Sequence, residues 1–161
     1  GDYFTINVSS PNTPELRALQ ERDSLVRIIR GLRAVNAVKP VLVKIAPDLD
    51  EGQLAEIADV ANSESLAGLI ATNTTLDQSA VPPESRQQGG LSGAPLSRRA
   101  TEVLKTLRRH TNLPIIASGG VMSGADAREK IDAGASLVQL YTGFVYSGPT
   151  LIREITTALA A

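Results

Sequence analysis

The chain of 161 residues contains no cysteine and no tryptophan, and its one histidine is His110. Without thiols, the chain cannot form disulfides, cysteine-ligated zinc sites or iron–sulfur clusters, and it has no cysteine nucleophile. A single histidine argues against a histidine-rich metal site and against a catalytic triad with a histidine base. We therefore expect no metal ligands among the site residues.

The chain also lacks an excess of charge of either sign and has few aromatic residues. Its 16 Lys and Arg residues and 17 Asp and Glu residues give a net charge of −1, and aromatic residues make up 3%. Nucleic-acid binding usually needs a basic surface and rings that stack on bases, so we expect no nucleic-acid partner. No apolar run approaches the ~20 residues of a membrane span, and no signal peptide opens the chain. These features are typical of a soluble protein whose chemistry uses Ser, Asn, Lys, Thr and a bound cofactor.

Strand-like and helix-like segments alternate along the whole chain. Short apolar runs bounded by Pro, Gly, Asn or Asp predict five strands, at Tyr3–Val8, Val41–Ala46, Gly68–Thr72, Pro114–Ser118 and Ser136–Tyr141. Apolar residues at helical spacing predict five helices, at Ser24–Val35, Glu51–Ala61, Arg98–Arg109, Ala125–Ala133 and Leu151–Ala160. Asp50 and Ser97 are the expected N-caps of the second and third helices, and Gly134 is the expected C-cap of the fourth. This alternation predicts parallel βα units.

Five βα units are compatible with a doubly wound sheet or with a (β/α)8 barrel, and polar residues at the strand ends favour the barrel. A barrel brings the carboxyl ends of all its strands to one mouth, where its active sites lie. Polar residues stand at these ends in all five strands: Asn7, Lys44, Thr72, Asn73, Ser118, Tyr141 and Thr142. A complete barrel has ~250 residues. We predict an α/β fold in which residues 1–161 form about the last five βα units of a partial TIM barrel, and we interpret Gly1 as a fragment boundary.

The segment Asn7–Thr13 follows the first strand and is rich in small polar residues. Alternation along the strand places Asn7 on the face that points into the barrel, together with Thr5. Ser, Pro and Asn are also common in plain turns, so an Asx or Ser/Thr turn that closes the strand is one interpretation. The other interpretation is that the amides and a hydroxyl of this loop bind one small polar ligand.

Lys44 lies in an otherwise apolar strand. A lysine in such a place costs free energy unless its ammonium group is paired or reaches water. The lysine can extend from the strand end into solvent, or it can contact an anion or an electron-rich cofactor. In a flavin enzyme, a positive charge near the N1 and O2 side of the ring stabilises the reduced cofactor.

Three glycine-containing segments follow the later strands. Ser118–Val121 and Tyr141–Gly143 follow the last two strands, where barrels often bind phosphate through backbone N–H groups. The alternative is that both are ordinary βα turns. The segment Gly89–Gly93 is either a flexible hinge or a further approach to phosphate. The long irregular stretch Leu76–Leu91 before it is typical of a lid or a disordered insertion.

The charged ends of the third helix have a simpler interpretation. His110 and the neighbouring arginines stand at the carboxyl end of the helix, where positive charge is favourable to the helix dipole. We interpret the pairs Arg98–Arg99 and Arg108–Arg109 as a solvated helix face.

Taken together, six motifs resemble the dihydroorotate dehydrogenases, and specifically the quinone-linked class 2 branch. The motifs span the whole chain in order: NVSSPNT (7–13), VLVKIAPDL (41–49), ATNTT (71–75), GGLSGAPL (89–96), SGGV (118–121) and DAGASLVQLYTGFVYSGP (132–149). Class 1 enzymes of this family carry a cysteine base in the first loop. Here Ser10 occupies the matching position, which favours class 2.

The resemblance implies an FMN-dependent barrel enzyme that oxidises dihydroorotate to orotate in pyrimidine biosynthesis. Ser10 matches the catalytic base that takes a proton from C5 of dihydroorotate while hydride leaves C6 for the flavin N5. A serine base must be activated by its surroundings, and Thr5 and bound water are candidate relay members. The positions that match orotate contacts are Asn7, Asn12, Asn73 and Thr74. The positions that match FMN contacts are Asn7, Lys44, Thr72, Gly93, Gly120, Tyr141 and Thr142.

The resemblance also implies a quinone as the final electron acceptor and a peripheral association of the parent enzyme with the inner membrane. That association uses an N-terminal segment that is absent from this sequence, and we expect the present segment itself to be soluble and inactive on its own. Two alternatives stay open. One is another FMN-barrel oxidoreductase, such as a class 1-type enzyme that uses fumarate or NAD, and the other is an inactive truncated fragment that binds a phosphate-bearing ligand.

Overall fold

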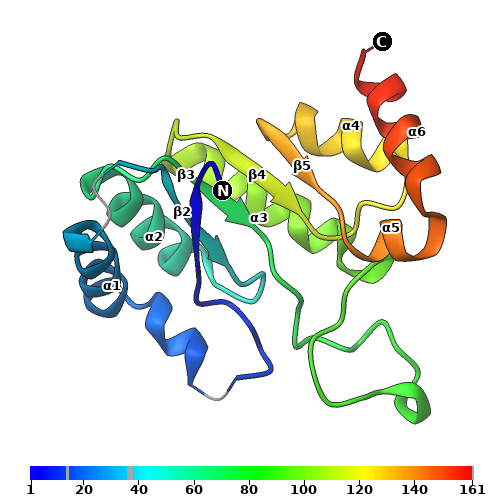
Figure 1. The fold of residues 1–161 in the computed structure, drawn as a ribbon. Helices are drawn as coiled ribbons and strands as arrows, with labels where there is room; N and C mark the ends of the chain where they lie inside the picture. The colour runs from blue at the N-terminus through cyan, green and yellow to red at the C-terminus, as the bar shows by residue number, and fades with distance from the viewer. Residues whose placement is uncertain (14, 36–37, 161) are drawn as a thin grey trace.

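A computed structural model describes residues 1–13, 15–35 and 38–160, which form a five-stranded parallel sheet with helices between the strands (Figure 1). The sheet order β1-β2-β3-β4-β5 follows the chain. The strands are β1 (Phe4–Asn7), β2 (Val41–Ile45), β3 (Gly68–Ala71), β4 (Ile115–Ser118) and β5 (Leu137–Gln139). The helices are α1 (Arg22–Val35), α2 (Glu51–Ser63), α3 (Ser97–His110), α4 (Gly124–Asp132), α5 (Thr142–Ser147) and α6 (Pro149–Ala160). Short 3-10 helices are η1 (Leu16–Gln20), η2 (Pro83–Ser85) and η3 (Ala94–Leu96).

All five predicted strands and all five predicted helices are confirmed, with ends that coincide or differ by at most two residues. The sequence did not predict α5, which begins at Thr142 directly after the last strand. Its six residues are too few to show a helical period. Its apolar residues are consecutive in the sequence, so they do not mark one face of a helix. Gly148 separates α5 from α6, which begins at Pro149.

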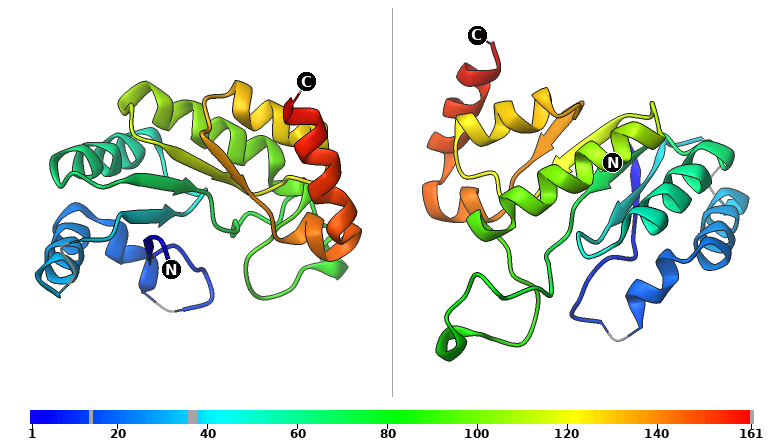
Figure 2. Two further views of the ribbon diagram at one scale, coloured as in Figure 1. Left: turned by 45° about the horizontal axis from the view of Figure 1, so that its top comes forward. Right: turned by 180° about the vertical axis from the view of Figure 1, so that it is seen from behind.

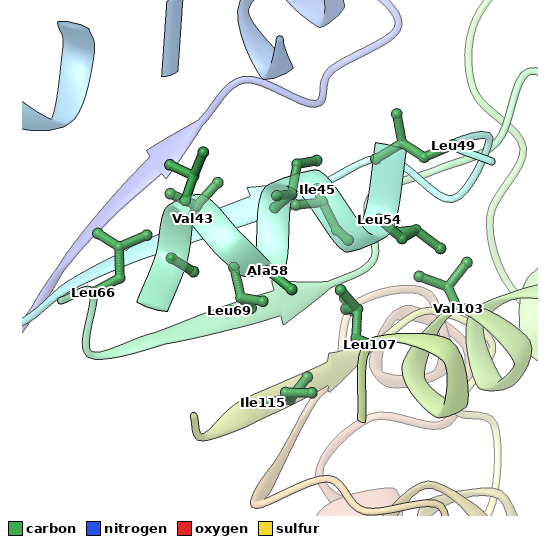
Figure 3. Packing of buried hydrophobic residues seen from close by; sticks show 14 of the residues in the cluster. Val43, Ile45, Leu49, Leu54, Ala58, Leu66, Leu69, Val103, Leu107 and Ile115 are labelled. Atoms are coloured by element: carbon green, nitrogen blue, oxygen red, sulfur yellow. The ribbon is translucent and has the colours of Figure 1, made fainter. Parts of the chain in front are cut away.

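Residues that alternate along the strands face two different environments. The outward residues of β2, β3 and β4, among them Val43, Leu69 and Ile115, pack against the helices in one large core (Figure 3). The inward residues Leu42 and Ile70 form a small separate cluster with Ile116. The helices cover one face of the sheet, and the other face is concave (Figure 2). A doubly wound sheet would carry helices on both faces, so this arrangement confirms the expected wall of a barrel.

The helix ends show how local sequence sets the boundaries. Asp50 caps α2 through a complete capping box, in which its side chain accepts from the Gln53 N–H and the Gln53 side chain accepts from the Asp50 N–H. The C-cap of α4 is Ala133 and not the predicted Gly134, which follows it with a positive φ of 103°, the conformation that glycine favours just after a helix. The predicted cap Ser97 is wrong. Ser97 is already the first residue of α3, because the preceding 3-10 turn at Ala94–Leu96 leads directly into the helix.

The interpretation of the arginine pairs as a solvated face is only half correct. Arg98 is 91% exposed, with its one ion pair to Glu102 on the same helix. Arg99 instead donates to the carbonyl oxygens of Pro47 and Leu49, at 2.8 and 2.7 Å. Arg108 likewise donates to carbonyl oxygens that follow α3 and α4. Buried carbonyl groups at loop ends need donors, and these two side chains supply them.

Within the described part of the chain, no helix combines the length and the apolar character that crossing a membrane requires.

The capping box of α2 leads to a stability prediction. We expect Asp50→Ala to destabilise the protein that carries this chain by about 1 kcal/mol, because the Gln53 N–H then loses its acceptor. Asp50→Asn is the matched control, since asparagine caps a helix nearly as well. The measurement is the midpoint of thermal unfolding by circular dichroism. Equal midpoints for the alanine and asparagine variants would contradict the prediction.

Candidate functional site

A cavity of about 330 Å³ lies where the carboxyl ends of the strands converge. Five parallel strands bring their ends to one edge of the sheet, and the long segment between β3 and α3 extends beyond that edge (Figure 1). The cavity volume is at the lower end of the ~300–1,000 Å³ that ligand pockets usually have. Its lining comes from the ends of β2 to β5 and from the loop before α3: Lys44, Thr72, Asn73, Thr74, Ser92, Gly93, Leu96, Ser118, Gly119, Gly120, Val121, Met122, Gln139, Leu140, Tyr141, Thr142 and Gly143.

One wall of the cavity consists of the glycine-containing segments that follow β4 and β5. Gly120 has a φ of 74°, and a Cβ atom there would overlap the backbone of Ser97 at the start of α3. This position therefore needs glycine both for its conformation and for the close approach. Across the cavity mouth, Thr142 Oγ1 donates to Ser92 Oγ at 2.9 Å, which ties the start of α5 to the loop before α3. The structure thus brings all three predicted phosphate-binding segments to one cavity.

Lys44 lies between this glycine wall and the first strands. Its Nζ donates to Gln139 Oε1 at 3.1 Å, across the concave face of the sheet. Burial lowers the pKa of Lys44 from its ordinary value, because desolvation disfavours the charged form. The half-buried side chain lines the cavity, which favours the interpretation that it contacts a bound group there. A cation that is partly desolvated and held by a neutral amide is well placed to attract an anionic or electron-rich group.

A cluster of amides and hydroxyls adjoins the other side of the cavity. Asn73 lines the cavity, and its Nδ2 donates to Ser9 Oγ at 3.1 Å and to Asn7 Oδ1 at 3.3 Å. The hydroxyl of Ser9 in turn donates to Asn7 Oδ1 at 3.0 Å. Asn73 Oδ1 accepts from the Thr74 N–H at 2.9 Å, which fixes the orientation of the amide. This network joins the ends of β1 and β3.

Ser10 and Asn12 lie in the loop after β1, beyond the cavity lining. Ser10 is half-buried, and its Oγ accepts from the Asn12 N–H at 3.3 Å. The neighbouring Ser9 is fully buried, and its hydroxyl is already engaged with Asn7 and Asn73. Ser10 is thus the serine of this loop whose hydroxyl is less engaged. Among the described residues, Thr5 and Ser10 share no hydrogen bond, so the structure does not bring this candidate relay pair together.

The stretch 76–91 folds back on itself and returns to the first loop. Its base is closed by antiparallel bonds between Thr75 and Leu91, at 3.1 and 2.8 Å. At its end, the backbone of Gly90 passes so close to Thr74 and Pro11 that a Cβ atom would overlap both side chains. Of the glycine-dense segment 89–93, the first part therefore packs loop against loop, and only the second part lines the cavity.

Three further polar residues near the site escaped the sequence analysis. Gln139 pairs with Lys44, and Arg17 forms an ion pair with Asp48 at 2.6 Å beside the first loop. Inward alternation on the last strand is a signal for Gln139, whereas the partnership of Arg17 with Asp48, 31 residues away, leaves no trace in a local pattern. Within residues 1–13, 15–35 and 38–160, no group of three or more His, Asp or Glu side chains is arranged to hold a metal ion.

Comparisons with known proteins all point to one family. The profile of the dihydroorotate dehydrogenases matches residues 1–161. The chain is 50% identical to the dihydroorotate dehydrogenase (quinone) of Gloeobacter violaceus, over 99% of this chain and 46% of that protein. It is 48% identical to the dihydroorotate dehydrogenase (quinone) of Christiangramia forsetii, over 96% of this chain and 47% of that protein. The chain therefore spans about half the length of the curated relatives it matches.

Solved structures give the same result for the fold. The crystal structure of the dihydroorotate dehydrogenase of Eimeria tenella in complex with ferulenol matches with a TM-score of 0.90 and 39% identity. The match covers 99% of this chain and 49% of that one. The ligand-free structure from the same organism matches with a TM-score of 0.89. These neighbours are TIM-barrel enzymes, so the partial barrel predicted from strand order and polar strand ends is confirmed.

The glycine wall of the cavity leads to a second stability prediction. We expect Gly120→Ala to destabilise the protein by more than about 1 kcal/mol, because alanine is strained at this positive φ and its Cβ overlaps Ser97. Gly31→Ala is the matched control, since a Cβ atom at this helical position meets nothing within 4 Å and should be neutral or stabilising. The measurement is the midpoint of thermal unfolding of both variants. A Gly120→Ala protein as stable as the control would contradict the packing described here.

Proposed function

Because the chain belongs to the dihydroorotate dehydrogenase family, we propose that the protein carrying it oxidises dihydroorotate to orotate in pyrimidine biosynthesis. FMN is the hydride acceptor in this proposal, and a quinone is the final electron acceptor. The chain forms the carboxyl-terminal portion of a single FMN-binding (β/α)8 barrel domain. The proposal rests on one observation. A glycine-walled cavity with a desolvated lysine adjoins an amide cluster and the Ser10 loop.

The chemistry of the cavity lining suits a flavin mononucleotide. The turns at Gly119–Gly120 and Tyr141–Thr142 line the cavity, and backbone N–H groups of such turns suit a phosphate. Lys44 suits the electron-rich edge of the ring, and Thr72, Gly93 and Tyr141 line the same cavity. Bound there, FMN would take up the hydride that the chain itself has no group to accept.

The amide cluster fits the substrate. Orotate carries a carboxylate and ring amides, and the amides of Asn7 and Asn73 can donate to an oxygen or accept from a ring N–H. The hydrogen bonds within the cluster hold Asn73 in one orientation before any ligand binds. Asn12 and Thr74 flank the cluster. Beside them, the segment at Gly90 packs against Thr74 and against the first loop. The substrate ring would therefore lie against amides on one side and against the cavity on the other.

Ser10 is the catalytic base in this proposal. It removes the proton from C5 of dihydroorotate while hydride leaves C6, so that the C5–C6 bond becomes double and two electrons leave with the hydride. A serine hydroxyl is a weak base, so water or a neighbouring group must take up its proton. The half-buried position of Ser10 allows a water molecule to reach its Oγ.

A quinone acceptor agrees with the surface next to the cavity. The helix α5 follows the cavity residues Tyr141 and Thr142 directly and exposes Phe144, Val145 and Tyr146. An apolar acceptor suits such a surface better than a small dianion such as fumarate does. The relatives named above carry quinone in their names, which favours class 2 over a class 1-type enzyme. Peripheral association of the parent enzyme with a membrane, through a segment outside this chain, is part of the same proposal.

The test of the function uses the complete protein that carries this chain. We expect dihydroorotate to bleach the flavin absorbance in a single turnover, and a quinone rather than fumarate or NAD to restore it. We expect Ser10→Ala to retain FMN but to slow flavin reduction by a factor on the order of 10² to 10⁴, the usual contribution of a general base. Ser136→Ala, at an exposed serine after α4, is the control.

Four outcomes of this test would count against the proposal. A flavin that dihydroorotate does not reduce would overturn the reaction, and reoxidation by fumarate or NAD alone would favour the class 1-type alternative. Reduction at the wild-type rate in Ser10→Ala would refute the assignment of the base. A protein that does not bind FMN in a fluorescence titration would favour the inactive phosphate-ligand fragment.

The lowered pKa of Lys44 leads to a prediction about pH. Above this pKa the side chain is neutral, so its attraction for an electron-rich ligand disappears there. We therefore expect the affinity for FMN to fall as the pH rises through the lowered pKa, at a pH below that of an ordinary lysine. Lys44→Met keeps the shape without the charge and should bind FMN more weakly, with no such pH dependence. Fluorescence titrations between pH 6 and about pH 10 provide the measurement. Equal affinity and equal pH dependence in both proteins would contradict the role of Lys44.

A further inference from the structure

Arg17 contacts the loops that follow three neighbouring strands. It lies in η1, directly after the Ser10 loop. Its Nε donates to the Ser9 carbonyl oxygen at 3.1 Å, its Nη2 donates to the Thr74 carbonyl oxygen at 2.8 Å, and its Nη1 pairs with Asp48 at 2.6 Å. These partners follow β1, β3 and β2 respectively. A single guanidinium group therefore binds all three loops with three different nitrogen atoms.

Asp48 also binds the loop that follows β3. Its Oδ1 accepts from the Thr75 hydroxyl, and its Oδ2 accepts from the Leu76 N–H at 3.0 Å. The carboxylate thus holds the segment that immediately follows Asn73 and Thr74. Both charged side chains are partly exposed, 19% for Arg17 and 29% for Asp48.

The backbone of η1 is itself fastened to the sheet. The buried Gln20 accepts from the Ala46 N–H at 2.9 Å, at the end of β2, and its Nε2 donates to the Arg17 carbonyl oxygen at 3.2 Å. The guanidinium therefore extends from a fixed base. Rigid support of this kind is what a group needs in order to position other groups.

We propose that Arg17 and Asp48 are a positioning pair, which fixes the loop carrying Ser10 relative to the amide cluster at Asn73 and Thr74. This inference rests on the proposed function, because it assigns the pair a part in proton removal by Ser10. The pair touches neither substrate nor cofactor and acts through the loops it binds. Its loss lets the Ser10 loop shift against the substrate site, and the glycine wall that holds FMN stays in place.

Two physical arguments separate this role from simple stabilisation. An exposed ion pair contributes about 0–1 kcal/mol to stability. The stability that this partly exposed pair adds therefore does not by itself explain why Arg17 and Asp48 bind three loops. A misplacement of catalytic groups by about 1 Å, in contrast, can cost 10²-fold in rate. The geometry also requires arginine, because three donors in a planar fork reach three loops, and the single ammonium group of lysine cannot reproduce them.

The experiment uses Arg17→Lys and Asp48→Asn in the complete protein that carries this chain. Arg17→Lys keeps the charge and removes the fork, and Asp48→Asn keeps the size and removes the charge. We expect flavin reduction at saturating dihydroorotate to slow about 10- to 100-fold in each variant. We expect FMN content and the FMN dissociation constant to stay at wild-type values, because the glycine wall is elsewhere. Glu64→Gln is the matched control, since it breaks the 2.7 Å pair of Arg30 and Glu64 between α1 and the end of α2.

A second set of variants tests whether the pair acts through Ser10. In a Ser10→Ala background, we expect Arg17→Lys and Asp48→Asn to slow flavin reduction no further, since the loop then carries no base to position. A further slowing by the same factor in that background would overturn the inference, as would wild-type reduction rates in both single variants. Loss of FMN from both variants would also overturn it, because the pair would then support the whole site. A wild-type protein whose flavin is not reduced by dihydroorotate would instead overturn the proposed function itself.

Discussion

The alternation of side chains along parallel strands is the constraint on which the rest of the structure depends. Successive residues point to opposite faces, and helices cover only one face of this sheet. Val43 and Ile45 therefore pack against helices, and Lys44 between them must point to the concave face. A shift of β2 by one residue would bury the lysine among leucines and open the core, so the apolar pattern of this strand fixes the position of the charge.

The same constraint divides the candidate site into two halves that differ in chemistry. The ends of β4 and β5 supply glycine backbone and few charged groups, which suits a phosphate that must be approached closely. The ends of β1 and β3 supply amides and hydroxyls, which suit a small ring with donors and acceptors. Lys44 lies between them and contacts Gln139 on the far strand, so it spans the boundary between the two halves. A cofactor and a substrate that exchange a hydride need adjacent sites of this kind.

Local patterns predicted most of the fold and several of the residues that line the candidate cavity. Strands and helices with several turns were identified because hydrophobic periodicity and caps such as Asp50 are encoded within a few residues. Ser97 was misjudged because the preceding turn already adopts a helical conformation, which a preference for serine caps cannot reveal. Lys44, Thr72, Asn73 and Gly120 were found because each stands at a strand end. The interactions of Gln139 and Asp48 were missed because they join residues that only the folded chain brings together.

The arginine residues show why such long-range interactions are needed here in particular. Without disulfides, the chain must hold its loops by other means, and loop carbonyl groups that leave water need donors. Arg17, Arg99 and Arg108 each donate to a carbonyl oxygen that is distant along the chain. The acceptors are Thr74, Pro47 and Gly134, respectively. Arg98, one residue from Arg99, points into solvent instead. Neighbouring arginines thus differ in their partners. The role of each arginine depends on which carbonyl groups the fold places within its reach. Arg17, beside the Ser10 loop, holds the backbone of two loops that border the candidate site.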